Sequence, residues 1–398
     1  MLGIVKAKGA VLFDEHGKEY IDGISSWYTS VYGHCNDAII AKVYAQMQQL
    51  DQVVFSGFTH EPAIALSEAL ISLLPENQEK LFFSDNGSTA TEIGIKMALQ
   101  YHHNLGKKRS VLMAFEDGFH GDTFGAMSVS GLSVYNGPFE DYFIEVKRIP
   151  VPTDANLEGL LHELENTMDL DAVAGFIYEP LVQGAAAMKM HKAEHLEKIL
   201  KVIKSHGVLA IADEVMTGFG KTGRHFASDY MTEKPDIICM SKALTAGMLP
   251  MAVTSCTQNV YDAFYSDDIA KGLFHGHTYT ANPLACAAAL AGIELLKSEG
   301  IQKNIGQIIQ WHQEFDAQIK DHPKVAATRQ TGIIYALDLN IVMERYGNVR
   351  DKLFQHFMDA GVFLRPLGNT IYISAPYIIS KDQMQRIYDS IRDVLEKF

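Results

Sequence analysis

The chain has 398 residues, of which 47% are hydrophobic and 21% are charged, a composition typical of a globular protein with a sizeable core. Its formal net charge of −14 and the lack of any basic tract exclude the dense positive surface that nucleic-acid-binding proteins present. The sequence contains no run of about 18 apolar residues and no secretory signal, so we expect a cytoplasmic protein without a membrane span.

The N-terminal segment is predicted to form a β-hairpin. Residues 10–23, AVLFDEHGKEYIDG, alternate apolar and polar side chains on both sides of a polar turn, and Gly17 supplies the positive φ that such a turn needs. We therefore expect the chain to begin with a small sheet, and we assign residues 1–55 to the N-terminal part of a small domain.

Residues 56–299 are predicted to form a large domain. Apolar segments of strand length alternate here with amphipathic helices, which is typical of α/β folds with a mostly parallel sheet flanked by helices. The strand candidates are KLFFSD (80–85), SVLMAF (110–115), VAGFIYEP (173–180), GVLAIADEV (207–215), DIICMSK (236–242) and MAVTSC (251–256). The four cysteines lack CxxC spacing, and we expect free thiols.

Residues 300–398 are predicted to complete the small domain as an α+β unit. The pattern indicates a helix around Trp311, a strand at 333–339, a helix at 349–360 that Gly361 ends, and a hairpin at 368–369. A last helix begins with a capping box formed by Ser380 and Gln383.

Lys242 follows one of the apolar segments directly. Ile237–Met240 is predicted to be a buried parallel strand, and ligands of such sheets bind beyond the carboxyl ends of the strands. Lys242 is therefore a candidate ligand-binding residue. The alternative is a strand-end lysine that points into solvent.

The segment SDNGSTATEIGIKMALQ (84–100) passes from a strand through a glycine turn into a helix. The backbone N–H groups of Gly87, Ser88 and Thr89 would lie at the positive end of the helix dipole, where a phosphate binds well. We also predict a capping box between Thr89 and Glu92. A plain capped helix without a ligand is the alternative.

Asp213 ends another apolar segment, and a carboxylate buried there requires a cation or donor. Together, Asp213, Lys242 and the turn at Gly87 provide a carboxylate for a pyridinium nitrogen, an amine for an aldehyde and a phosphate site, which pyridoxal phosphate needs. The glycines at 218, 220 and 223 match a dinucleotide fingerprint, but the segment that follows is too short and aromatic for the required helix.

Three further segments carry candidate residues. In EDGFHGDT (116–123), Phe119 either stacks on the cofactor or packs in the core, and His120 lacks the neighbouring ligands that a metal site needs. Thr278 lies in a polar loop that fits either a dimer interface or the surface. Arg365 lies in an apolar stretch, and it either binds an acidic substrate or forms a structural ion pair.

These motifs resemble one known family. NGST (86–89), FHGDTFGAMSVSG (119–131), EPLVQGA (179–185), ADEVMTGFGKTG (212–223), SKALTAG (241–247) and HGHTYTANPLACAAAL (275–290) are similar to the class III, fold-type I aminotransferases that depend on pyridoxal phosphate. The resemblance runs nearly end to end. Within the family, SSWY (25–28) and RPLGNTIY (365–372) are similar to members that aminate 8-amino-7-oxononanoate in biotin biosynthesis.

The resemblance implies roles for particular residues. Lys242 would bind the cofactor covalently, Asp213 would contact the pyridine nitrogen, and both would be catalytic. The other implied cofactor-binding residues are Gly87, Ser88, Phe119, His120, Glu179, His277 and Thr278, with Gln183 near the cofactor. The implied substrate-binding residues are Trp27, Tyr28, Phe119, Gly276, Arg365 and Tyr372. Thr278 would reach the cofactor of a second subunit, which implies a homodimer with shared active sites. We expect no metal, because the histidines and carboxylates lack the spacing of metal ligands.

The sequence departs from the family pattern at three points. Phe119 replaces a tyrosine, Tyr28 replaces the second of two tryptophans, and the sequence begins beyond a WHPYT-like element of the family. The resemblance implies S-adenosylmethionine as amino donor, with lysine as the alternative. The other functions that the sequence leaves open are an aminotransferase for omega-amino acids or ornithine, a noncatalytic binding protein and, as the weakest, a nucleotide-dependent dehydrogenase.

Overall fold

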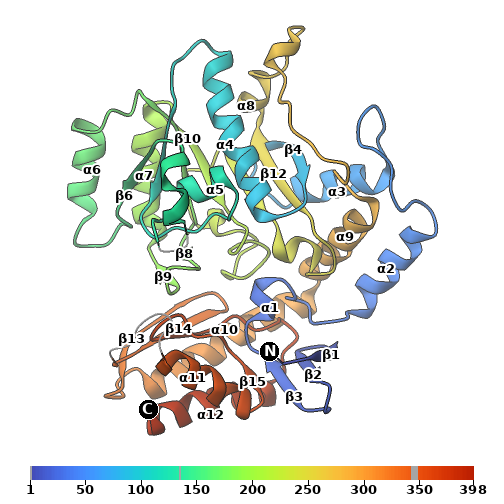
Figure 1. The fold of residues 1–398 in the computed structure, drawn as a ribbon, viewed down its shortest axis with the longest axis vertical. Coiled ribbons are helices and arrows are strands. Elements are labelled where there is room, and N and C mark those ends of the chain that lie inside the picture. The colour runs from blue at the N-terminus through green and yellow to red at the C-terminus, as the bar shows by residue number, and fades with distance from the viewer. Residues whose placement is uncertain (1, 134–135, 342–347) are drawn as a thin grey trace.

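The computed structural model describes residues 2–133, 136–341 and 348–398. Its central element is a seven-stranded sheet with strand order β4–β12–β11–β10–β7–β5–β6 (Figure 1). β12 runs in the opposite direction to the other six strands of this sheet, as the pairings show. The strands are β4 (Gln78–Ser84), β5 (Val111–Phe115), β6 (Val146–Ile149), β7 (Val173–Tyr178), β10 (Leu209–Asp213), β11 (Ile237–Met240) and β12 (Ala252–Thr257).

All six predicted strands of this sheet are confirmed, and β6 is an addition. Its sequence, Val-Lys-Arg-Ile, contains two charged residues at the edge of the sheet, so no apolar run indicated it. β10 and β11 are buried at every residue, as expected for parallel strands covered on both faces.

Helices cover the sheet on both faces. α4 (Gly87–Asn104) packs on β11 and β12, and α7 (Ala193–Ser205) packs on β10. At Gly94 a side chain would lie 3.2 Å from the Cys239 sulfur, so glycine allows α4 to approach the sheet closely. The other helices in this part of the chain are α3 (Glu61–Ile71), α5 (Phe124–Val129), α6 (Leu157–Asn166), α8 (Gln258–Asp262) and α9 (Pro283–Lys297). The earlier helix α2 (Asp37–Met47) packs on α9.

The two ends of the chain join in one sheet, of order β1–β2–β3–β15, in the lower part of Figure 1. The predicted hairpin is confirmed: β2 (Val11–Asp14) and β3 (Glu19–Asp22) are antiparallel, and Gly17 has a φ of 81°. β3 also pairs in parallel with β15 (Val362–Phe363), so N-terminal and C-terminal residues form one unit. The first strand is β1 (Ile4–Lys8).

The C-terminal residues add a three-stranded sheet of β13 (Val325–Thr331), β14 (Ile334–Leu339) and β16 (Thr370–Ile373). The predicted helices are present as α10 (Glu299–Ile319), α11 (Asn348–Asp359) and α12 (Lys381–Lys397), and the Ser380–Gln383 capping box is confirmed. The predicted hairpin at 368–369 is only a tight turn closed by one bridge between Leu367 and Thr370, because β15 pairs with β3 instead.

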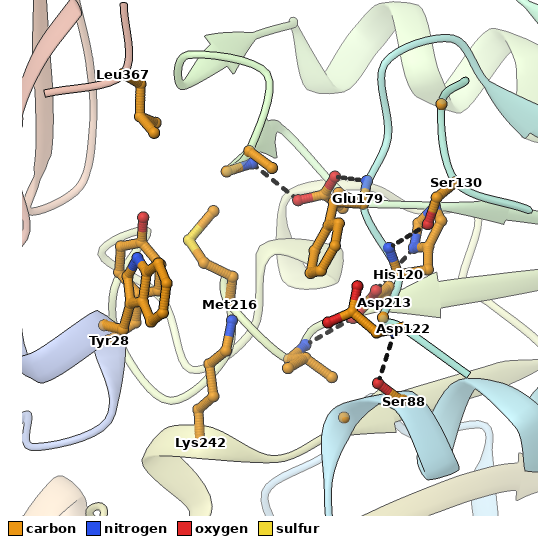
Figure 2. A pocket seen from close by; sticks show the side chains of 18 of the residues that line it. Tyr28, Ser88, His120, Asp122, Ser130, Glu179, Asp213, Met216, Lys242 and Leu367 are labelled. Carbon is orange, nitrogen blue, oxygen red and sulfur yellow. Dashed lines mark hydrogen bonds and ion pairs between the residues drawn. The ribbon is translucent and has the colours of Figure 1, made fainter. Parts of the chain in front are cut away.

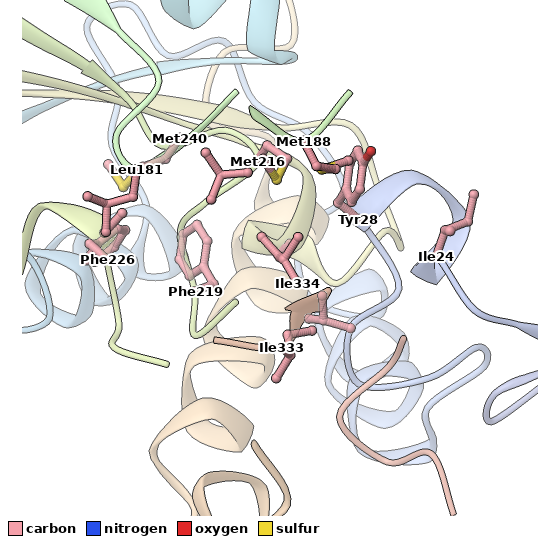
Figure 3. Close-up of a cluster of buried hydrophobic side chains, with 14 of the residues drawn as sticks. Ile24, Tyr28, Leu181, Met188, Met216, Phe219, Phe226, Met240, Ile333 and Ile334 are labelled. Carbon is pink, nitrogen blue, oxygen red and sulfur yellow. The ribbon is translucent and has the colours of Figure 1, made fainter. Parts of the chain in front are cut away.

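A continuous hydrophobic core joins the residues around the seven-stranded sheet to the unit formed by the two ends of the chain (Figure 3). Met216 and Phe219, which follow β10, belong to the same cluster of buried side chains as Ile333 and Ile334 of the C-terminal unit. The Tyr377 hydroxyl also donates a hydrogen bond to the carbonyl of Phe219, at 2.6 Å. The loop after β10 is therefore fixed from both sides.

None of the helices in the described residues combines the length and apolar character that crossing a membrane requires.

Candidate active site

A cavity of about 780 Å³ lies at the carboxyl ends of the parallel strands. Each of four neighbouring strands contributes a lining residue just beyond or at its end: Phe119 after β5, Glu179 after β7, Asp213 at the end of β10 and Lys242 after β11. The opposite wall comes from the terminal unit and contains Trp27, Tyr28 and Arg365. This is the position where α/β sheets bind ligands.

Lys242 reaches into this cavity, between Tyr28 on one side and Asp213 on the other (Figure 2). Its backbone has a φ of 50°, an unfavourable conformation for a residue with a side chain. Burial lowers the pKa of the Lys242 amine, and the negative charges of Asp213 and Glu179 oppose that shift. A lowered pKa increases the share of neutral amine, the form that attacks an aldehyde.

Asp213 is buried and has two hydrogen-bonding partners. One carboxylate oxygen, Oδ2, lies 2.7 Å from Nδ1 of His120, and Oδ1 accepts the backbone N–H of Val215 at 3.0 Å. The backbone N–H of His120 in turn donates to Ser130 Oγ at 2.9 Å. The buried Asp213 carboxylate was expected to face a cation or a hydrogen-bond donor, and its side-chain partner is His120.

Glu179 is a second buried carboxyl group in the cavity wall. It accepts the backbone N–H groups of Phe119 at 3.0 Å and Gly184 at 2.8 Å, and it thereby fixes the loop that carries Phe119 (Figure 2). Burial raises the pKa of Glu179 to about 7, and the nearby Asp213 adds to this shift. The total negative charge of the cavity wall therefore changes near neutral pH.

The glycine turn at the start of α4 forms the floor of the cavity. A side chain at Gly121 would lie 2.2 Å from Ser88 Oγ, and one at Gly87 would lie 2.9 Å from Val215 Cγ1, so both positions are closed to larger residues. Ser88 Oγ accepts the backbone N–H of Asp122 at 3.1 Å. The N–H groups of Gly87 and Ser88 at the start of α4 have no partner within the helix, which leaves them available to an anion, whereas the Thr89 N–H already donates to Asn86 Oδ1.

The predicted capping box between Thr89 and Glu92 is wrong. α4 begins at Gly87, and its capping box is formed by Asn86 and Thr89, with the Thr89 N–H donating to Asn86 Oδ1 at 3.0 Å. Glu92 Oε1 accepts instead from Thr123 Oγ1, Gly125 N–H and Ala126 N–H at 2.5, 2.7 and 3.1 Å. The helix begins earlier than the pattern indicated, so Glu92 lies too far along it to cap it and serves α5.

Arg365 and Trp27 lie in the wall opposite the strand ends. The Arg365 guanidinium carbon lies 4.8 Å from the centre of the Trp27 ring. No carboxylate in the described residues forms an ion pair with Arg365, so its charge remains available to an acidic ligand. Tyr28 faces Lys242, with the amine 5.1 Å from the ring centre.

Five predicted site residues do not line this cavity. Tyr372 is buried behind Tyr28, with 6.1 Å between the ring centres. Gly276, His277 and Thr278 lie in the loop before α9, where the Thr278 carbonyl accepts from Gln52 Nε2 at 2.7 Å. The buried Gln183 lies beside the lining and donates to the Glu116 carbonyl at 2.9 Å. The roles of these residues remain predictions.

Several lining residues were not predicted. Three of them are polar residues that follow α5, namely Ser130, Ser133 and Asn136, and their spacing of three residues was the one sequence signal that could have identified them. Arg350 lies on α11, and an arginine in a helix has no pattern that marks it as a site residue. The remaining additions are Ser26, Thr29, Asn86, Gly121, Asp122, Met127, Gly131, Gly184, Ala185, Val215, Met216, Pro366 and Leu367.

Comparison with known proteins identifies the family. The family model described as "Aminotransferase class-III" matches residues 1–395. The chain belongs to the class-III aminotransferases.

This class-III aminotransferase is similar over its whole length to curated relatives. It is 43% identical to the adenosylmethionine-8-amino-7-oxononanoate aminotransferase of Synechococcus elongatus, over 100% of this chain and 95% of the relative. The enzyme of the same name from Geobacter sulfurreducens is 36% identical, over 98% and 90% of the two chains.

Solved structures confirm the predicted fold class. The class-III aminotransferase superposes with a TM-score of 0.94 on adenosylmethionine-8-amino-7-oxononanoate aminotransferase from Methanocaldococcus jannaschii, at 30% identity over 100% of this chain and 93% of that chain. An amine transaminase from an uncultivated Pseudomonas species, in its PLP-bound form, gives a TM-score of 0.94 at 27% identity over 100% and 95%. The chain thus has the α/β fold of the fold-type I pyridoxal phosphate enzymes.

Proposed function

We propose that this class-III aminotransferase transfers an amino group to 8-amino-7-oxononanoate and yields 7,8-diaminononanoate in biotin biosynthesis. The observation that carries the proposal is the arrangement of one cavity, with Lys242 and Asp213 at the strand ends and Arg365, which forms no ion pair with a described residue, in the opposite wall. An amino ketone with a distant carboxylate fits such a cavity. The 43% identity to an enzyme named for this substrate supports the same function.

We propose pyridoxal phosphate as the cofactor, because the residues present fit it. Lys242 would hold its aldehyde carbon, Asp213 its pyridine nitrogen, and Gly87 with Ser88 its phosphate at the start of α4. The close contact between Gly121 and Ser88 shapes the floor where that phosphate would lie. When bound, pyridoxal phosphate supplies an electron sink and carries the amino group between the two half-reactions.

The protein's own groups then have separate tasks. The Lys242 amine holds and returns the proton that leaves the substrate carbon. Asp213, oriented by His120, presents its carboxyl group to the site. Phe119 covers one face of the site, and Glu179 keeps its loop in place. Arg365 binds the substrate carboxylate and orients the chain toward Lys242.

We also propose a homodimer in the cytoplasm, with residues 1–55 and 300–398 forming a small domain and residues 56–299 a large one. Large apolar side chains are exposed next to the loop that carries Gly276, His277 and Thr278: Phe274 is 70% and Tyr279 66% exposed. Exposed apolar surface of this kind is typical of subunit contacts. Thr278 would then complete the site of the second subunit.

Incubation of the purified holoenzyme with 8-amino-7-oxononanoate and a panel of amino donors tests the function. Formation of diaminononanoate, detected by mass spectrometry, is the expected result with S-adenosylmethionine, with lysine as the alternative donor. The Lys242→Ala variant provides the control. Absence of diaminononanoate with every donor would contradict the proposal, and turnover of simple amines alone would favour the amine transaminase function named for a similar structure.

A further inference from the structure

Four consecutive residues in the cavity wall have left-handed backbone conformations. Ser25, Ser26, Trp27 and Tyr28 have φ values of 49°, 45°, 67° and 73°. These residues form α1 (Ser25–Tyr28), which is therefore a left-handed turn. Left-handed helical backbone is unfavourable for every residue except glycine, and none of these four is glycine. Such a turn persists only where its surroundings hold it, and it is found mainly at functional sites.

One buried carboxylate holds the turn. Asp22 is completely buried, and its Oδ2 accepts the Ser26 hydroxyl at 2.8 Å and lies 2.8 Å from Nε2 of His34. Its other oxygen, Oδ1, accepts the Ile24 N–H at 3.2 Å. At the start of the turn, the Ser25 hydroxyl donates to the Ser374 carbonyl at 2.7 Å. The Asp22 side chain of β3 and a backbone carbonyl of the C-terminal unit thus fix the turn from two directions.

The turn places two adjacent aromatic rings against two different cationic side chains of the cavity. The Trp27 ring lies 4.8 Å from the Arg365 guanidinium, and the Tyr28 ring lies 5.1 Å from the Lys242 amine. Figure 2 shows Tyr28 across the cavity from Asp213, on the side of the terminal unit. In extended or right-handed backbone, adjacent side chains would point in other directions. The left-handed turn therefore fixes the Trp27 ring, which contacts Arg365, relative to the Tyr28 ring, which contacts Lys242.

We propose that Asp22, Ser26 and His34 are positioning residues that fix this turn, and that the turn determines which length of carboxylate substrate the enzyme accepts. The inference rests on the proposed function, because it takes Arg365 as the carboxylate site and Lys242 as the reacting end. A substrate whose carboxylate and ketone match the fixed span reaches both groups. A homologue with one methylene fewer reaches only one of them.

Two substitutions at Ser26 separate a role in holding the turn from general damage. Ser26→Ala removes the hydrogen bond to Asp22 but keeps the cost of the left-handed backbone. Ser26→Gly removes the same bond and also removes that cost, because glycine adopts positive φ freely. Asp22→Asn weakens both contacts of Oδ2. Asp14→Asn is the matched control, since Asp14 is also buried in the N-terminal sheet but accepts only from its own hairpin and Tyr20.

The first measurement is kcat/KM of each holoenzyme for 8-amino-7-oxononanoate and for the homologue one methylene shorter. We expect Ser26→Ala and Asp22→Asn to lower the preference for the longer substrate about tenfold, mainly through KM, with kcat nearly unchanged. Ser26→Gly should recover most of the preference, and Asp14→Asn should retain all of it.

The second measurement does not depend on activity. The chain has two tryptophans, so Trp311→Phe leaves Trp27 as the only one. Loss of the turn should shift the Trp27 emission in Ser26→Ala, and Ser26→Gly should restore it. Unchanged length preference and unchanged emission in Ser26→Ala and Asp22→Asn would overturn the inference. Failure of the unmodified enzyme to aminate the nine-carbon substrate would instead overturn the proposed function.

Discussion

Asp213 Oδ2 lies 2.7 Å from Nδ1 of His120, and both side chains are almost fully buried in the wall of the cavity. The pair joins the end of β10 to the loop after β5, and Ser130 Oγ accepts the backbone N–H of that histidine. His120 therefore orients the carboxylate, a role that explains a buried histidine without a metal.

Replacing Asp213 by asparagine should lower kcat about 10²- to 10³-fold, because a neutral amide cannot stabilise a protonated pyridine nitrogen of the proposed cofactor as a carboxylate would. Stopped-flow measurement of each half-reaction checks this. Asp14→Asn is the matched control and should react like the unmodified enzyme. A loss of less than threefold would contradict the assigned role.

Lys242 should be the only lysine that the cofactor marks. Borohydride reduction of the holoenzyme, followed by peptide mapping, should place the label on the peptide that contains Lys242. Lys221 is an internal comparison, because it is also buried and burial lowers its pKa to about 7. A label on Lys221, or none at all, would contradict the assignment.

Glu179 should make stability depend on pH. Burial raises its pKa from 4.5 to about 7, so between these values the unfolded chain is ionised while the folded protein keeps the proton. The folded state therefore loses stability as pH rises through this window, by about 3 kcal/mol in total. The group has no further effect above the folded-state pKa.

Glu179→Gln removes this titration. Compared with the unmodified cofactor-free protein, the variant should gain relative stability between pH 5 and pH 8, as measured by urea unfolding at each pH. The exposed Glu145→Gln is the control, and its curve should run parallel to that of the unmodified protein. Parallel curves for Glu179→Gln would show that this carboxyl group does not titrate in the window.

Glu92→Ala should lower the free energy of unfolding by about 1–2 kcal/mol, because three donors at the start of α5 lose their acceptor. Denaturant unfolding measures the change. Glu61→Ala is the control, since Glu61 is an exposed residue in the first turn of α3. An equal effect of both substitutions would indicate that only the helix dipole matters.

Arg365→Lys should raise KM for the oxononanoate about tenfold and leave the donor half-reaction with a small amine that has no carboxylate unchanged. Lysine keeps the charge but loses the two parallel hydrogen bonds that a guanidinium makes to a carboxylate and its stacking on Trp27. Steady-state kinetics with both substrates checks this. An equal loss with the amine that has no carboxylate would assign Arg365 a structural role.

The sequence determined the local elements and three residues of the site. An apolar run that ends in a polar residue identifies a buried parallel strand, and strands of this kind place their carboxyl ends at one edge. For this reason Lys242 and Asp213, together with the turn at Gly87, were predicted to meet, and all three line one cavity. The periods of strands and helices are local properties, so sequence pattern is enough to reveal them.

The tertiary structure decided the partners of the polar groups. Glu92 caps α5 and not its own helix, His120 faces Asp213, and β15 pairs with β3 and not with β16. The left-handed turn at Ser25–Tyr28 is also held by a long-range contact, the hydrogen bond from the Ser25 hydroxyl to the Ser374 carbonyl. Hydrogen bonds of this kind join residues that only folding brings together, and no local period in the sequence records which donor meets which acceptor.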